Sequence, residues 1–274
     1  MSNKSVKKNF IFSSILTVSE YLFPLITFPY VSRVLGVDGV GICNYVDSVI
    51  FYFILLSKLG IETVGIRSIA SCNDDKQKLQ QVFSSLLTLL LCSTTIAIFA
   101  LFIVVYTVPS FADYTEYFYI GACKLFSTFL LIEWFYKGRE DFKYITKRSL
   151  TVKAMYVLSI FIFVQSPEDT FTYYLITCGL TIVNSAINII HSHKLVNFSF
   201  KDVQINVFLK PLVFFGIYQF LTSMYTTFNV FYLGFVTNTT QVGYYVTQVS
   251  EVKIQYSMPS GQVGLVMPSG DCQQ

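Results

Sequence analysis

The sequence predicts an all-α integral membrane protein. Only 13% of its 274 residues are charged, whereas soluble domains contain about 25%. The mean hydropathy is +0.57, and long apolar stretches recur along the chain. A helix that crosses the bilayer needs roughly 20 mostly apolar residues. Seven stretches meet this requirement, over residues 10–32, 40–60, 82–107, 114–136, 149–166, 171–191 and 211–236.

Lysine and arginine gather in every second connection between these spans. They precede the first span and lie in the second–third, fourth–fifth and sixth–seventh connections. Loops rich in Lys and Arg stay on the cytoplasmic side of a membrane. The pattern predicts a multi-pass membrane protein with a cytoplasmic N-terminus.

Several function classes lack support in the sequence. The net charge of +3 is too small to favour nucleic acid as a partner. The chain contains no Walker A loop, no GxSxG and no HExxH motif, and its six cysteines show no metal-binding spacing. We therefore expect no enzyme, no catalytic or metal-ligating residues and no cofactor. Without a nucleotide site, transport would run downhill or on a gradient of H⁺ or Na⁺.

Three ionisable side chains, Glu20, Asp47 and Lys124, lie well inside predicted spans. Each costs about 2.5–3.5 kcal/mol to insert at mid-membrane, so such groups normally face a protein interior or a wet cavity. Lys58 lies near a cytoplasmic end, where its long side chain can reach the interface. The many Ser and Thr residues of the spans are explained as well by ordinary hydrogen bonds between helices.

Four segments resemble the polysaccharide flippase family. They are Phe28–Gly36 followed by Gly39–Gly41, then Gly60–Ala70, then Glu133–Glu140 with Arg148 beyond, and finally Tyr232–Gly234 with Val242–Tyr245. The family belongs to a superfamily that also holds multidrug antiporters and the lipid II flippase. The resemblance covers residues ~1–245, and its segments follow the order and membrane positions of the family.

The resemblance implies a transporter of two helical lobes around a central cavity. Residues 1–208 would form the six-span N-terminal lobe and residues 209–248 the first span of a second lobe. Residues 249–274 carry MPSG twice without an apolar run. We expect a polar tail there, either disordered and aberrant, as at a truncated or out-of-frame end, or simply periplasmic.

The implied substrate is an undecaprenyl-pyrophosphate-linked oligosaccharide, carried from the cytoplasmic to the periplasmic leaflet for surface polysaccharide synthesis. The sequence gives no basis for choosing between O-antigen, capsule and exopolysaccharide. A pyrophosphate needs cationic groups along its route, so the substrate-binding candidates are Lys124, Lys58 and Arg33, with Glu20 and Asp47 pairing Lys124 or carrying a coupling ion. Candidates for recruiting lipid head groups at the cytoplasmic surface are Arg67, Arg139 and Arg148.

The other expected partners are membrane lipids and the polysaccharide polymerase or chain-length machinery.

The sequence also leaves two other functions open. A cation-coupled multidrug or metabolite antiporter of the same fold would favour a cavity dominated by carboxylates, whereas this chain mixes both signs. A membrane glycosyl polymerase would need a large periplasmic loop with catalytic residues, and every predicted periplasmic connection is short.

Overall fold

The computed structural model describes residues 6–72, 75–199 and 203–257. These residues form helices and the turns between them, with no strand in the described part of the chain. The elements are α1 (Val6–Lys58), α2 (Ile61–Ala70), α3 (Lys76–Thr107), η1 (Pro109–Tyr114), α4 (Thr115–Ser127), η2 (Thr128–Leu130), α5 (Glu133–Gly138), α6 (Phe142–Phe163), η3 (Pro167–Asp169), α7 (Thr170–Ser192), α8 (Ile205–Val236) and α9 (Thr239–Ser257).

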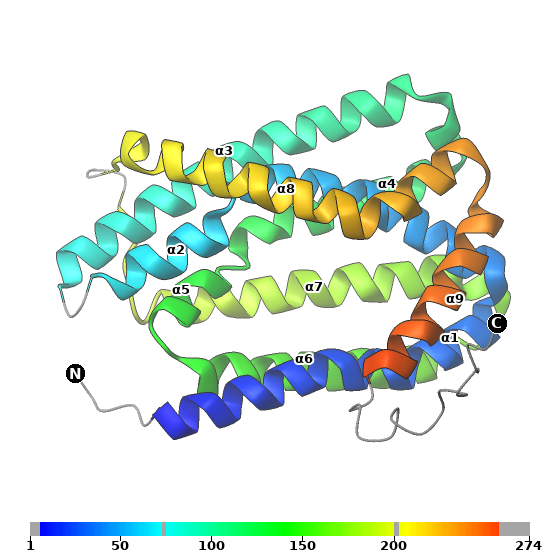
Figure 1. Ribbon diagram of the computed structural model, residues 1–274, viewed down its shortest axis with the longest axis horizontal. Coiled ribbons are helices and arrows are strands. Elements are labelled where there is room, and N and C mark those ends of the chain that lie inside the picture. Colours follow the sequence, from blue (N-terminus) through cyan, green and yellow to red (C-terminus); the bar gives the residue numbers. More distant parts are fainter. Residues whose placement is uncertain (1–5, 73–74, 200–202, 258–274) are drawn as a thin grey trace, which may run out of the picture.

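The helix labelled α1 consists of two helices that turn back on each other at Gly36. Gly36 has φ 68° and ψ −176°, a conformation open essentially only to glycine. The first half contacts α6 near both ends, through Thr146 to Phe12 and Tyr30 to Val164. The second half runs back to α2, so the two halves lie antiparallel in the bundle (Figure 1). Pro24 and Pro29 lie within the helical first half, and the sharp turn occurs at the glycine instead.

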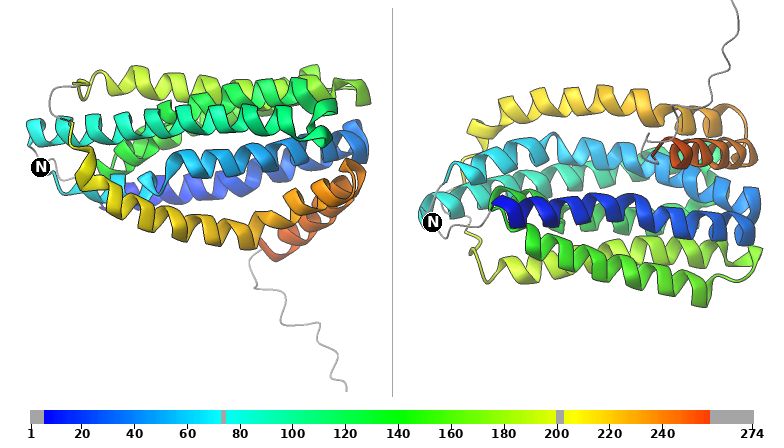
Figure 2. Two further views of the ribbon diagram at one scale, coloured as in Figure 1. Left: turned by 90° about the horizontal axis from the view of Figure 1, so that it is seen from above. Right: turned by 60° about the horizontal axis from the view of Figure 1, so that its bottom comes forward.

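The bundle is a multi-pass membrane protein. Five stretches are long and apolar enough to cross a membrane: Lys7–Ala70, Lys76–Thr107, Pro109–Gly138, Pro167–Ser192 and Ile205–Met224. Successive long helices run back and forth along one axis, as both views of Figure 2 show. Large apolar side chains such as Ile96, Phe99 and Leu158 point outward and are more than half exposed. An apolar exterior of this extent is suited to lipid and not to water.

The interior is packed with aromatic side chains and broken at two places near the end where α1 begins. One buried cluster joins α2, α3 and α5 around Phe83, Trp134 and Phe135. Beside it the chain leaves helical geometry at Leu59 and Gly60, which both have positive φ, and again after η2, where Leu131 has ψ 69°. These two breaks separate α1 from α2 and α4 from α5.

The predicted spans mostly coincide with observed helices, and two details differ. The expected continuous span over 114–136 is divided into α4, η2 and α5. No proline or glycine in residues 128–132 announces this break. Helix α9 continues to Ser257 and so extends into the segment 249–274 predicted as a tail. The remainder of that segment lies outside the described residues.

Candidate functional site

An ion pair occupies the middle of the bundle, between Asp47 and Lys124. The Lys124 ammonium donates to both carboxylate oxygens of Asp47, at 2.8 and 2.9 Å. Asp47 lies midway between Gly36 and Lys58, about 16 Å along the helix axis from each. That distance is about half the thickness of the bilayer hydrocarbon core. We call Asp47 and Lys124 the central pair.

Three helices build the central pair. The second half of α1 supplies Asp47, α4 supplies Lys124, and Tyr174 of α7 donates its hydroxyl proton to Asp47 at 3.2 Å. The Lys124 side chain is 16% exposed and that of Asp47 is 37% exposed. The pair is thus neutral, shielded on the lysine side and accessible on the carboxylate side.

The structure brings together only part of the predicted site. Lys124 pairs with Asp47, as the sequence predicted for one of its two candidate carboxylates. Glu20 lies on the first half of α1, exposed, and forms no ion pair with the described residues. Arg33, near the Gly36 turn, is likewise exposed and forms no ion pair with the part of the chain that is described.

A second set of polar side chains, four of them charged, lies at the end of the bundle where α1 begins, and we call it the end cluster: Glu62, Glu133, Lys137, Arg148 and Asn188. Lys137 contacts Glu62 at 2.6 Å and Glu133 at 3.8 Å. Arg148 contacts Glu133 at 2.6 Å and also donates to the Asn188 side chain. Negative and positive side chains therefore alternate from α2 through α5 to α6, and the Asn188 amide of α7 ends the series.

The three arginines predicted to recruit lipid head groups lie in different surroundings. The Arg148 side chain is only 2% exposed, so it lies in the protein interior and not at a lipid-facing surface. Its long side chain points inward because Glu133 and Asn188 supply its partners there. Arg67 is exposed and lies over the Phe215 ring of α8 at 5.2 Å. Arg139 lies over the Phe135 ring at 5.6 Å.

Lys58 lines a small cavity beside the end cluster. The cavity measures about 30 Å³ and is also lined by Glu62, Glu133, Thr128 and Trp134. Lys58 itself forms no hydrogen bond or ion pair with the described residues. The sequence placed this lysine on a substrate route, whereas the structure places it at the junction of the two helix breaks.

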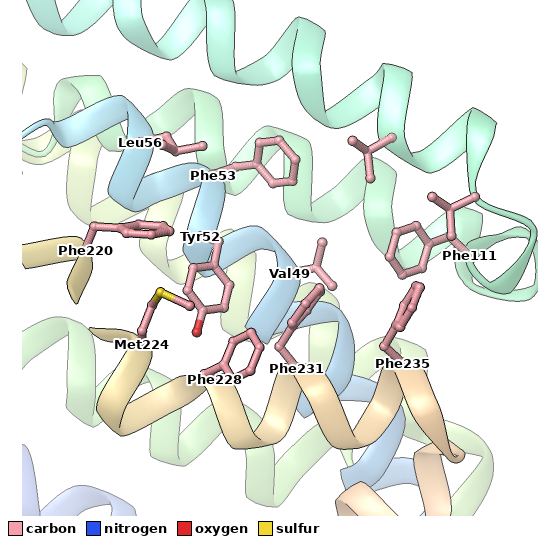
Figure 3. Close-up of a pocket in the computed structure, with 12 residues that line it drawn as sticks. Val49, Tyr52, Phe53, Leu56, Phe111, Phe220, Met224, Phe228, Phe231 and Phe235 are labelled. Atoms are coloured by element: carbon pink, nitrogen blue, oxygen red, sulfur yellow. The ribbon is translucent and has the colours of Figure 1, made fainter. Parts of the chain in front are cut away.

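A larger, apolar groove lies between α8, the second half of α1 and the end of α3 (Figure 3). Its volume is about 380 Å³, and every lining side chain is apolar or aromatic. Figure 3 shows Tyr52 and Phe53 on one wall and Phe228, Phe231 and Phe235 of α8 on the other. A groove of this chemistry is suited to a hydrocarbon chain.

Sequence reasoning missed most of the end cluster. The spacing of Glu133 and Lys137, four residues apart, was a usable signal, because such residues meet on one helix face. Asn188 and Tyr174 carried no comparable signal, since their partners lie on distant segments. Trp134 is buried at 3% exposure, and only the structure places it beside Lys58.

Comparison with known proteins agrees with the resemblance found in the sequence. The model of the family described as "Polysaccharide biosynthesis protein" matches residues 6–254, which is nearly the whole chain. The chain belongs to this family. The match begins at the first helix and ends within α9, so it includes both the central pair and the end cluster.

Two curated family relatives are named "Putative O-antigen transporter". The one from Escherichia coli strain K12 is 26% identical over 244 residues, covering 87% of this chain. The one from Shigella dysenteriae is 25% identical over 234 residues, covering 84% of this chain. The alignments cover 58% of each relative, so the chain spans less than two thirds of their length. No solved structure matches the chain.

Proposed function

We propose that the chain is the first part of a flippase for lipid-linked oligosaccharides. It would carry an undecaprenyl-pyrophosphate-linked sugar chain from the cytoplasmic to the periplasmic leaflet of the bacterial inner membrane, with its own N-terminus in the cytoplasm. The observation that carries the proposal is the family match over residues 6–254. The names of the two relatives support export of a surface polysaccharide.

The central pair supports a role in receiving the pyrophosphate. A doubly charged head group cannot enter hydrocarbon alone, and a cation at mid-membrane gives it a favourable stopping point. Asp47 neutralises the charge of Lys124 between transport cycles. The arriving phosphate then replaces Asp47 as the ion-pair partner of Lys124. The freed carboxylate is then a natural acceptor for a coupling H⁺ or Na⁺.

The remaining candidates take secondary roles in this proposal. Arg33 lies just before the Gly36 turn and Lys58 at the far end of the second half of α1, and each would attract the head group as it arrives or leaves. Arg67 and Arg139 would recruit anionic lipid at the cytoplasmic surface. The apolar groove would accept the lipid tail, because its lining is aliphatic, thioether or aromatic, with the Tyr52 hydroxyl as its polar group. A polymerase or chain-length protein would take the product.

The test is an exchange of segments with the relative from Escherichia coli. Residues 6–248 of this chain replace the aligned part of that relative, and the chimaera is expressed in a strain that lacks it. The measurement is surface polysaccharide, with the amount of membrane-inserted chimaera determined in parallel. We expect Lys124→Ala to abolish the signal and Lys147→Ala, which removes an exposed charge from α6, to leave it unchanged.

The charge-swapped variant, Asp47→Lys with Lys124→Asp, separates transport from structure. If the pair only holds helices together, the swapped pair restores surface polysaccharide. If Lys124 receives the phosphate, the swapped variant inserts into the membrane and remains inactive. Retained polysaccharide in Lys124→Ala overturns the assignment, and resistance to cationic dyes with no polysaccharide favours the antiporter instead.

A further inference from the structure

A second lysine, Lys153, lies halfway along α6. It is 11 residues from the first residue of that helix and 10 from the last, which is about 15 Å from each end along the helix axis. Its ammonium donates to the Ser19 hydroxyl at 2.9 Å. This contact lies seven residues beyond the Thr146–Phe12 hydrogen bond on both helices. From this depth the side chain cannot reach the polar interface, where lysines of membrane helices usually place their charge.

Lys153 lies close to carboxylates, but it is not paired with one. Glu20 and, after it, Glu133 contribute to its electrostatic surroundings, yet Lys153 forms no ion pair with the described residues. Glu133 is already bonded to Arg148, and Glu20 is exposed on the first half of α1. The neighbours of the Lys153 ammonium are instead a hydroxyl and the Phe23 ring, at 5.9 Å. We call Glu20 and Lys153 the open pair.

Tyr156 connects the open pair to the central pair. It lies one turn beyond Lys153 on the same face of α6, and its hydroxyl donates to that of Tyr173 on α7 at 3.5 Å. Asp47 contributes to the electrostatic surroundings of Tyr156, and Tyr156 contributes to those of Lys124. The two lysines therefore lie near the same tyrosine, on different helices and at a similar depth.

The open pair supplies what the central pair lacks. A pyrophosphate head group is doubly charged, whereas the central pair offers one cation once Asp47 is displaced. A second negative charge without a partner would be costly at this depth. Lys153 can bind an anion without first losing a carboxylate, because its hydrogen-bond partner is the uncharged Ser19 hydroxyl.

We infer that Lys153 is a second mid-membrane contact for the pyrophosphate, with Lys124 binding one phosphate and Lys153 the other. Glu20 is the counter-charge of Lys153 while no substrate is bound. The sequence offered Glu20 as a partner of Lys124, whereas the structure places its carboxylate in the surroundings of Lys153. The inference rests on the proposed function and adds a residue to the same site.

Binding of inorganic pyrophosphate tests the inference without a lipid-linked sugar. The purified full chain in detergent is titrated with inorganic pyrophosphate and, separately, with inorganic phosphate by isothermal titration calorimetry at constant ionic strength. We expect the wild-type chain to bind pyrophosphate roughly tenfold more tightly than phosphate, because only pyrophosphate meets both lysines at once. Equal affinities for the two ligands in the wild-type chain overturn the inference.

Variants at the open pair show which side chain is responsible. Lys153→Met should weaken pyrophosphate binding roughly tenfold, as for the loss of one charge-assisted hydrogen bond, and leave phosphate binding through Lys124 in place. Glu20→Gln removes the competing carboxylate and should tighten pyrophosphate binding. Lys147→Met is the matched control at an exposed position of α6. Unchanged pyrophosphate binding in Lys153→Met overturns the inference, and so does the same result in the neutral double variant, Glu20→Gln with Lys153→Met, if the single variant does not fold.

Transport separates this inference from the proposed function. The chimaera that contains residues 6–248 is compared with its Lys153→Met form and with its neutral double variant. If Lys153 binds the pyrophosphate, both variants insert into the membrane and lose surface polysaccharide. Polysaccharide retained in Lys153→Met, or restored in the double variant because Lys153 only balances Glu20, overturns the inference and leaves the proposed function standing. A wild-type chimaera without polysaccharide contradicts the proposed function, and the calorimetric comparison then decides about Lys153.

Discussion

The central pair and the end cluster both place charges inside a membrane bundle, and they are connected differently. In the central pair, one lysine meets one carboxylate, and a single tyrosine completes the set. In the end cluster, Lys137 and Arg148 each contact Glu133, and each makes a further contact, Lys137 with Glu62 and Arg148 with Asn188. Breaking one contact in the end cluster leaves several groups without their partners.

This difference suits the two regions to different tasks. The carboxylate of the central pair is 37% exposed, and an incoming anion that displaces it leaves only Asp47 to be satisfied by water or a coupling ion. The end cluster joins α2, α5, α6 and α7 at the place where two helices are interrupted. We therefore expect substitutions at the end cluster to affect stability most, and those at the central pair to affect transport most.

Removal of Arg148 is expected to give the largest loss of stability. Arg148→Ala removes a side chain that is only 2% exposed and leaves Glu133 with Lys137 alone and the Asn188 side chain without its arginine partner. Removing one partner of a buried ion pair costs about 3–5 kcal/mol in free energy of unfolding. Chemical unfolding in mild detergent measures this loss.

The adjacent residue provides the control for that experiment. Lys147 is exposed on the same helix, so Lys147→Ala should change the free energy of unfolding by less than about 0.5 kcal/mol. An equal effect of the two substitutions would mean that the end cluster does not hold the helices together, and the contrast with the central pair would be lost.

Substitution of Gly65, which packs against Trp134, is expected to have an intermediate effect on the free energy of unfolding. A Cβ at Gly65 would lie 2.7 Å from the Trp134 ring, and a rigid indole cannot retract easily. Gly65→Ala should destabilise the chain by about 1–3 kcal/mol through overpacking. At Gly179 of α7 a Cβ meets nothing within 4 Å, so Gly179→Ala should be neutral or stabilising by up to about 1 kcal/mol.

The measurement is again unfolding in detergent, followed through the fluorescence of Trp134. A shift of the emission in the folded state of Gly65→Ala would report movement of the indole itself. If Gly65→Ala proved as stable as Gly179→Ala, the helix break beside Trp134 would be loosely packed, and the expectation that substitutions at this end of the bundle affect stability most would be weakened.

Sequence reasoning located most of the long helices and named both residues of the central pair, Asp47 and Lys124. It did not find the contacts that join distant segments in the end cluster. Apolar length gave the positions of α3, α7 and α8, and the cost of mid-membrane charge drew attention to Asp47 and Lys124. The same reasoning could not choose between Asp47 and Glu20 as the partner of Lys124, because periodicity fixes the face of a helix and not its neighbour. The break at 128–132 went unpredicted because no proline or glycine marks it in the sequence.

The smallest predicted effect tests whether the two regions are energetically separate. Tyr174→Phe removes a 3.2 Å hydrogen bond to Asp47 and should cost about 0.5–1.5 kcal/mol. Lys124 donates to the same carboxylate, so Tyr174→Phe and Lys124→Met should be non-additive by at least about 0.5 kcal/mol in a double-mutant cycle. Tyr136 donates instead to the Asn188 carbonyl at 2.6 Å, about 21 Å further along α7 than Tyr174. Tyr136→Phe and Lys124→Met should therefore add within about 0.5 kcal/mol, and coupling between them would show that α7 links the central pair to the end cluster.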